Sequence, residues 1–253
     1  MEITILGSGT STGIPEVGCT CPVCTSSDPH DNRLRASALV KTKGTNILID
    51  CGPDFREQML VHSKYGRLDG VLITHEHYDH VGGIDDLRPF CRFGEVPLYT
   101  EENTAQRLRT RMPYCFSEHK YPGIPQISIT NVSTESPFHI GDVEILPLRI
   151  YHGKSPILGY KIENMAYITD MLTMPQEEYS KLKGLDCLIM NALRIEPHIT
   201  HQTLDQAIEN AKRIGAKQTW FIHMSHHLGL HAEVEKKLPP NMHLAYDRLV
   251  IKP

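Results

Sequence analysis

A cluster of histidines around an aspartate restricts the fold of this 253-residue chain more than any other feature of its sequence. Residues 70–74 read as a buried apolar strand that leads directly into His-Glu-His-Tyr-Asp-His at 75–80. Residues two apart in an extended segment point the same way, so His75 and His77 can present their imidazoles to one ion. Asp79 and His80 are adjacent, point in different directions and suit a second ion nearby. The spacing therefore predicts a pair of metal ions where a strand ends.

The chemistry of these side chains restricts the type of ion. Imidazole and carboxylate suit borderline or hard divalent ions such as zinc, manganese or iron, and the motif contains no thiolate. A lone histidine is more often an ordinary buried or surface residue, but this density favours the ligand interpretation. Histidine is also abundant, with 15 in the chain, of which nine lie within 75–80, 198–201 and 223–231. Gly82 and Gly83 are expected to let the backbone turn after the motif.

Charge and cysteine content restrict the partners and the compartment. The chain has 26 basic and 30 acidic residues, a net charge of −4, without long runs of one sign, which disfavours a large polyanionic partner. No stretch approaches the roughly 18 apolar residues of a membrane span, and the start of the chain is acidic and strand-like, unlike a signal peptide. Seven cysteines, an odd number, do not suggest a secreted disulfide framework. We therefore expect a soluble, cytoplasmic protein with reduced thiols.

Short apolar or β-branched segments alternate with a smaller number of helical patterns. Strands are predicted at 2–6, 38–42, 46–50, 70–74, 96–100, 127–132, 143–150, 157–162, 165–169, 187–191, 219–224 and 243–246. Helices are predicted at 53–61, 105–111, 175–183, 203–214 and 231–238, the clearest being 203–214, whose apolar stripe ends at Gly215. Residues 112–126 are expected to form a surface loop near the site.

The order of these elements predicts the fold class. Hairpin-like strands near the start, followed by alternating strands and helices in the last third, indicate an α/β sandwich of two mixed sheets with outer helices. The length suits one domain over residues 1–253. A chain of this size can build its core without a metal ion or a disulfide, so a metal site must have another purpose.

The motif at 75–80 resembles the signature of the metallo-β-lactamase superfamily, whose members share a four-layer αββα sandwich with two metal ions at one sheet edge. The resemblance extends over the whole chain, and Asp50 matches a structural aspartate of the family, although it would serve equally well as a turn-capping residue. An aspartate shared by two cations offsets their repulsion and leaves positions for a bridging hydroxide. The resemblance implies that His75, His77 and His152 bind one ion, that Asp79, His80 and His223 bind the other, and that Asp170 bridges both.

A second group of candidate ligands lies at Cys19, Cys21 and Cys24. Three thiols this close favour a soft tetrahedral ion, and a closed structural zinc site needs a fourth ligand. His226 is our choice, with His227 adjacent; a reduced, unliganded loop or a redox pair is the alternative. The loop resembles the phosphodiesterase branch of the superfamily, which includes cyclic phosphoribosyl phosphate phosphodiesterase. It is similar also to the branch that serves pyrroloquinoline quinone biosynthesis.

The resemblance implies hydrolysis of a small phosphodiester, for example a cyclic one, by water activated between two zinc or manganese ions. His201, at the start of the predicted helix 203–214, matches a catalytic histidine of phosphodiesterase relatives and is the expected general acid. Asp79 is expected to shuttle protons from the attacking water. His198 needs no catalytic role to explain it. Arg35 and Arg88 would bind phosphate or form structural ion pairs, and we favour ion pairs.

Other functions fit parts of the sequence. A transfer-RNA 3′-processing nuclease would use the same ions, but the net charge and the lack of a basic, Gly-rich insertion argue against long nucleic acid as a partner. A metal-holding accessory or regulatory protein would hydrolyse nothing, yet every expected ligand is present. A lactonase or β-lactamase would leave the cysteine loop and His201 unexplained. We therefore expect a small-molecule phosphodiesterase, with homodimer formation as in many relatives.

Overall fold

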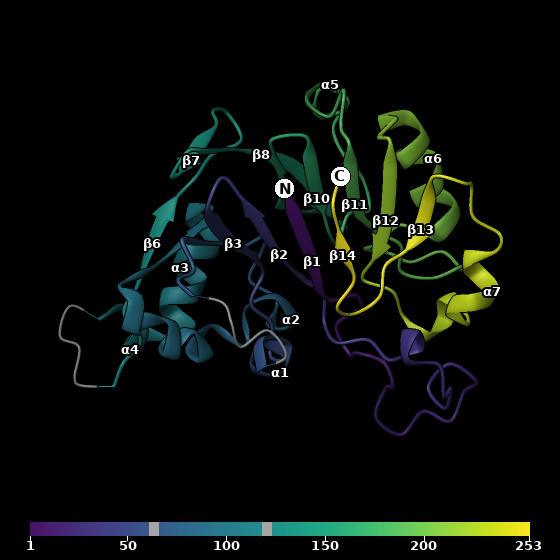
Figure 1. Cartoon of the computed structure of the whole chain (residues 1–253), viewed down its shortest axis with the longest axis horizontal. Coiled ribbons are helices and arrows are strands. Elements are labelled where there is room, and N and C mark those ends of the chain that lie inside the picture. The colour runs from purple at the N-terminus through teal and green to yellow at the C-terminus, as the bar shows by residue number, and fades with distance from the viewer. Residues whose placement is uncertain (61–65, 118–122) are drawn as a thin grey trace.

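The computed structural model describes residues 1–60, 66–117 and 123–253, and two seven-stranded sheets form its centre (Figure 1). The first sheet has the order β14-β1-β2-β3-β4-β5-β6 and the second the order β13-β12-β11-β10-β9-β8-β7. The first contains β1 (Glu2–Gly7), β2 (Ser37–Thr42), β3 (Thr45–Ile49), β4 (Gly70–Leu72), β5 (Val96–Thr100), β6 (Ile127–Asn131) and β14 (Val250–Ile251). The second contains β7 (Phe138–Ile140), β8 (Val143–His152), β9 (Ser155–Ile162), β10 (Met165–Ile168), β11 (Cys187–Asn191), β12 (Gln218–Ile222) and β13 (Met242–Leu244).

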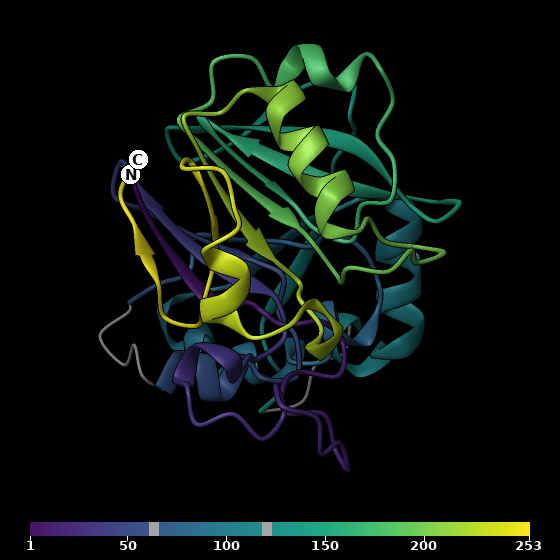
Figure 2. The ribbon, with the colours of Figure 1, turned by 90° about the vertical axis from the view of Figure 1, so that its right-hand side faces the viewer.

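Helices lie on the outer sides of the two sheets, as Figures 1 and 2 show. The part of the chain before β6 contributes α1 (Phe55–Leu60), α2 (Tyr78–Val81), the 3-10 helix η2 (Ile84–Phe93), α3 (Glu102–Arg111) and α4 (Pro113–Phe116). The C-terminal part contributes α5 (Glu178–Lys181), α6 (Leu204–Ile214) and α7 (His231–Glu235). Two short 3-10 helices, η1 (Pro29–Asp31) and η3 (His226–Leu228), lie in connecting segments.

Three separate groups of buried apolar side chains hold these layers together. One group packs the first sheet against its helices and includes Leu48, Phe55 and Leu108. A second fills the space between the sheets, where Val40 of β2 and Ile189 of β11 belong to the same cluster. The third packs the second sheet against its helices. Three apolar interfaces separate four layers, so the predicted αββα sandwich of two mixed sheets is confirmed.

Local sequence signals explain the best-predicted elements. The hairpin between β2 and β3 turns at Lys43 and Gly44, whose φ angles of 48° and 76° suit a two-residue turn. Helix α6 begins at a capping box formed by Thr203 and Gln206 and ends at Gly215, which has a left-handed φ of 73°. The hairpin and the end of the helix at Gly215 agree with the prediction from the residues.

The structure differs from the sequence prediction in several short elements. The edge strands β7 and β14 were missed, because two or three residues show no periodicity. The expected surface loop at 112–126 is wrong in part, since it contains α4, and its residues 118–122 lie outside the described part, as does the end of the predicted helix 53–61. Among the described helices, none combines the length and the hydrophobicity needed to cross a bilayer.

Candidate metal centre

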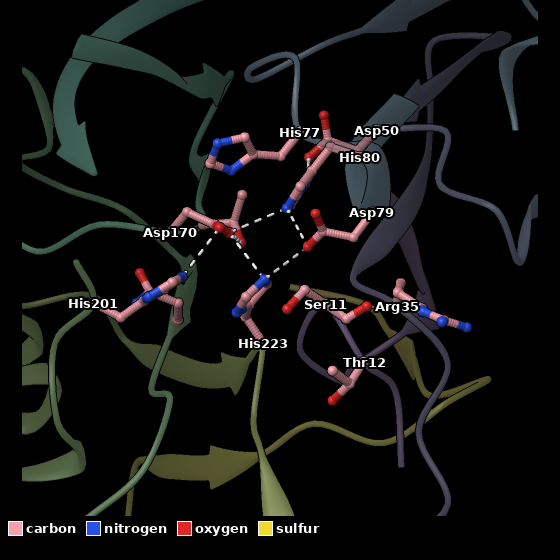
Figure 3. A network of polar contacts seen from close by, with 12 residues as sticks. Ser11, Thr12, Arg35, Asp50, His77, Asp79, His80, Asp170, His201 and His223 are labelled. Atoms are coloured by element: carbon pink, nitrogen blue, oxygen red, sulfur yellow. Dashed lines mark hydrogen bonds and ion pairs between the residues drawn. The ribbon is translucent and has the colours of Figure 1, made fainter. Parts of the chain in front are cut away.

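The ends of several strands meet at one edge of the sandwich and carry the predicted ligands (Figure 3). Strand β3 is parallel to β4, and β10, β11 and β12 are parallel to one another, so their carboxyl ends point the same way within each sheet. His152 ends β8 and Asp170 follows β10. His223 follows the last residue of β12, whereas the predicted strand 219–224 would have included it. Asp170 and His223 have φ angles of 58° and 55°, a left-handed conformation that costs energy for residues other than glycine. The fold therefore maintains strained backbone where these side chains leave the strands.

The first group of ligand atoms belongs to His75, His77, His152 and Asp170, and these atoms lie within 4.8 Å of one another. Nε2 of His75 is 3.0 Å from Nδ1 of His77 and 3.8 Å from Oδ2 of Asp170. His77 is exposed, whereas the other three side chains are buried. The extended backbone at His75 and His77 brings both imidazoles to one point, as their spacing predicts.

The second group consists of Asp79, His80, Asp170 and His223, all buried, with ligand atoms again within 4.8 Å of one another. Nε2 of His80 lies 3.1 Å from Asp79 Oδ2 and 3.3 Å from Asp170 Oδ1. Nε2 of His223 lies 3.4 Å and 3.2 Å from the same two oxygens. Tetrahedral ligands about 2.0 Å from a zinc ion are themselves about 3.3 Å apart, which matches this spacing. Asp79 and His80 converge on one point because a helical turn, α2, carries them, so the expectation that adjacent side chains diverge is wrong here.

The environment of His80 tests whether a cation fits here. Its Nδ1 lies 2.7 Å from Oδ2 of the buried Asp50, so this nitrogen donates and Nε2 is left for the centre. Nε2 has no hydrogen-bond partner among the described residues although it faces the carboxylates of Asp79 and Asp170. Burial opposes charge on His80, but the three carboxylates prevail and raise its pKa well above the ordinary value. The buried site thus favours positive charge. One proton cannot bind four converging ligand atoms at once, whereas a metal cation can.

Other contacts fix the orientation of the ligands. Asp50 accepts hydrogen bonds from the backbone N–H of Thr74 at 2.8 Å and from its hydroxyl at 2.9 Å, which holds the carboxylate against His80. Nδ1 of His152 lies 3.1 Å from the carbonyl oxygens of both Asp170 and Thr200, so Nε2 is free to bind an ion. Asp50 therefore orients a ligand, and its interpretation as a structural aspartate fits. Sequence reasoning missed Thr74 and Thr200, which no motif distinguishes.

Glycines let the motif pack closely against the loop after β3. Gly82 and Gly83 form a turn after the motif, as we expected, but their φ angles of −63° and −98° are ones that other residues also adopt. Close packing is what requires glycine at positions 83 and 52. A Cβ on Gly83 would lie 2.1 Å from the carbonyl oxygen of Gly52, and a Cβ on Gly52 would lie 2.0 Å from the carbonyl oxygen of Asp79. Such distances leave no room for a side chain.

His201, the predicted general acid, lies beside Asp170, which belongs to both ligand groups. Its buried Nε2 is 3.2 Å from Oδ2 of Asp170. On its other side, Nδ1 is 2.9 Å from the hydroxyl of Thr200 and 3.2 Å from Nδ1 of His198. Burial lowers the pKa of His201, while the contact with Asp170 opposes this effect. Burial raises the pKa of Asp79, but His80 and His223 outweigh it and hold that pKa below the ordinary value, so Asp79 is ionised at neutral pH.

The three cysteines and His226 form a separate cluster. Nδ1 of His226 lies 3.2, 3.5 and 3.3 Å from Sγ of Cys19, Cys21 and Cys24, close to the separation of about 3.6 Å between sulfur and nitrogen ligands of a tetrahedral zinc ion. The backbone N–H of Cys24 lowers the pKa of the Cys21 thiol to about 6, while burial raises that of Cys24 to about 11. His226 faces the sulfur atoms, whereas Nε2 of His227 lies 3.0 Å from Nε2 of His226, on the side away from them. The donor set fits a structural zinc ion.

The two arginines that we considered as phosphate ligands form ion pairs. Arg88 binds Asp85 at 2.8 Å on the surface, and Arg35 binds Asp54 at 2.9 Å.

Two mixed sheets with a carboxylate shared by two ligand groups at their common edge define a class of metal-dependent hydrolases. The sequence profile of the beta-lactamase superfamily domain matches residues 45–224. The crystal structure of a new diphosphatase from the PhnP family superposes with a TM-score of 0.92 and 40% identity, covering 99% of this chain and 97% of that one. The chain therefore belongs to the metallo-β-lactamase superfamily and, within it, to the PhnP-like branch.

Curated relatives carry different names. The Octanoyltransferase of Porphyromonas gingivalis is 49% identical over 251 residues, 98% of this chain, but the chain spans only 51% of that protein. The activity in the name of this longer protein is therefore not carried over to the chain. Coenzyme PQQ synthesis protein B of Methylobacterium radiotolerans is 26% identical over 220 residues, which cover 76% of this chain and 72% of that protein.

Proposed function

We propose that this hydrolase cleaves a small phosphodiester with a pair of divalent ions, zinc or manganese. The observation that carries the proposal is the position of Asp170, one carboxylate oxygen of which faces His75 and His201 while the other faces His80 and His223. The proposed ligands of the pair are His75, His77, His152 and Asp170 for one ion and Asp79, His80, Asp170 and His223 for the other. Cys19, Cys21, Cys24 and His226 are proposed to hold a third, structural zinc ion.

The residues around the two proposed metal ions have different roles in the reaction. Two bound cations would lower the pKa of a shared water and offset the negative charge on the phosphoryl oxygens. We assign to Asp79, which is ionised, the acceptance of a proton from the attacking water. His201 is placed on the opposite side of Asp170, and we assign to it the donation of a proton to the leaving alkoxide. An anionic phosphate next to its ring would favour the protonated imidazole, against the effect of burial.

The similar diphosphatase supports phosphorus as the centre of attack. A diphosphate with a substituent at each end and a phosphodiester share one property, a phosphoryl group with a single negative charge and an oxygen leaving group. We therefore include diphosphate diesters beside cyclic phosphodiesters in the proposed substrate class. Because ligands come from both sheets, we propose that residues 1–253 act as one hydrolase domain; a homodimer stays a prediction.

Two measurements test the proposal. Elemental analysis of the purified protein should find three metal ions per chain. The protein, loaded with zinc or manganese, should then hydrolyse bis(p-nitrophenyl) phosphate and at least one cyclic phosphodiester or diphosphate diester. Full metal loading without turnover of any of these would favour the accessory role. Cleavage confined to transfer-RNA precursors, with binding that weakens steeply as salt rises, would instead indicate a nuclease.

A further inference from the structure

The glycine-rich segment after β1 contains two backbone amides without a partner in the described structure. In residues 8–13, the N–H groups of four residues are bonded: Ser8 to Asp247, Gly9 to Leu34, Thr10 to Met224 and Gly13 to Thr10. The N–H groups of Ser11 and Thr12, and the hydroxyl of Ser11, make no hydrogen bond within the described residues. Ser11 and Thr12 are exposed and are the two central residues of the turn closed by the bond from Gly13 to Thr10.

This turn lies against the second ligand group. Gly9 pairs with Met224, and the N–H of Thr10 donates to the carbonyl of Met224 at 3.0 Å, so the segment runs beside the residue after His223. Figure 3 shows Ser11 next to Asp79 and His223. This pairing fixes the turn beside the second ligand group.

Arg35 anchors the turn from the other side. Its Nε donates to the carbonyl of Ser11 at 3.1 Å and its Nη1 binds Asp54 at 2.9 Å. A Cβ on Gly52 would meet both Cβ of Arg35, at 3.7 Å, and the carbonyl of Asp79, at 2.0 Å, so the arginine and the metal motif share one packing site. Among the described residues, the only carboxylate bonded to the turn is that of Glu16, which accepts from the Thr12 hydroxyl at 3.1 Å and leaves the two amides free.

We propose that the Ser11–Thr12 turn binds a non-bridging oxygen of the substrate's phosphoryl group through its two N–H groups and the Ser11 hydroxyl. Successive amides that point outward from a turn form an anion-binding concavity, and hydrogen bonds to a charged acceptor are the stronger ones. Arg35 is a positioning residue: it fixes the carbonyl side of the turn, while Asp54 offsets its charge. The inference rests on the proposed function, since it assumes that the second ligand group faces a phosphoryl group.

The first test uses the zinc-loaded, ¹⁵N-labelled protein and inorganic phosphate as the probe. We expect the amide proton signals of Ser11 and Thr12 to move downfield as phosphate is added, because both would gain a charged acceptor. If the chemical shifts of the Ser11 and Thr12 amide protons do not change at saturating phosphate, the inference is overturned. This measurement needs no variant and no turnover. Phosphate that moves both amides while no ester is cleaved would reject the proposed function alone, whereas turnover with unmoved amides would reject the turn alone.

The second test compares variants by calorimetric titration of the zinc-loaded proteins with phosphate. Ser11→Pro removes one N–H at a turn position that proline accepts, and it should weaken phosphate binding about 10- to 100-fold with unchanged zinc content. Ser11→Ala removes only the hydroxyl and should have a smaller effect. Ser136→Ala, at an exposed position of another loop, is the matched control. Unchanged affinity in folded, zinc-loaded Ser11→Pro would overturn the inference; if this variant does not fold, the amide signals of the unaltered protein decide.

Discussion

Nε2 of His201 lies 3.2 Å from Oδ2 of Asp170, a residue that also contributes to both groups of ligand atoms. The imidazole therefore stands beside the pair without belonging to either group. Such a position suits a residue that exchanges a proton with the substrate, since its lone pair is not needed to hold an ion. Substitution of His201 distinguishes the two roles, because loss of a metal ligand lowers the metal content whereas loss of a general acid lowers turnover alone.

We predict that His201→Ala lowers kcat about 10²- to 10⁴-fold on a phosphodiester with a poor leaving group, while the metal content stays at three ions per chain. The loss should shrink for a p-nitrophenolate leaving group, which needs no proton. Steady-state kinetics and elemental analysis check both points. His139→Ala, an exposed histidine on β7, is the control. Unchanged turnover of both substrates would remove the general-acid assignment.

The cysteine cluster should lose its ion independently of the pair. His226→Ala removes the nitrogen that faces three sulfur atoms, so we expect two metal ions per chain instead of three and a lower melting temperature. His227→Ala changes the neighbouring histidine, which faces away from the sulfur atoms, and should retain three ions. Inductively coupled plasma analysis of both variants checks the expectation. Loss of an ion from His227→Ala but not from His226→Ala would reverse the assignment.

The sequence predicted the site more completely than the connections around it. His75, His77, Asp79 and His80 follow one apolar strand, and this local signal needs no knowledge of the fold. The ligands after β8, β10 and β12 are each a single polar residue at a strand end, and only the resemblance to a family ordered them. The Ser11–Thr12 turn has no such signal, because its position depends on pairing between Gly9 and Met224, which lie far apart in the chain. Likewise, no residue pattern reveals that Gly52 and Gly83 touch.

Removal of the metal ions should reverse the pH dependence of stability. Burial disfavours charge on His80, but Asp79, Asp170 and Asp50 raise its folded-state pKa well above the unfolded value of about 6.5. A raised histidine pKa stabilises the fold below the unfolded value, and this contribution is lost as pH rises through the folded one. The free energy of unfolding of the chelated protein should therefore fall as the pH rises above about 6.5. The metal-loaded protein should behave oppositely on acidification, because protons compete with ions for the same nitrogens.

Urea unfolding at several pH values, with and without a chelator, checks this reversal. His80→Gln provides the control, since it should remove the alkaline decline of the chelated protein. A chelated protein whose free energy of unfolding stays constant or increases as the pH rises above about 6.5 would contradict the role of the three carboxylates.

The metal motif packs so closely against the loop after β3 that adding one methyl group at Gly52 should lower both stability and metal binding. In Gly52→Ala the new Cβ would lie 2.0 Å from the carbonyl oxygen of Asp79, so the motif or the loop must move. Overpacking of this kind costs about 1–3 kcal/mol in the free energy of unfolding. Because the displaced carbonyl belongs to a proposed ligand, the variant should also bind fewer ions in the pair. Gly66→Ala is the matched control, as a methyl group there would have no atom of the described residues within 4 Å, chain neighbours aside, and the φ angle of Gly66 is not left-handed. Equal stability and equal metal content in the two variants would show that the loop can yield without disturbing Asp79.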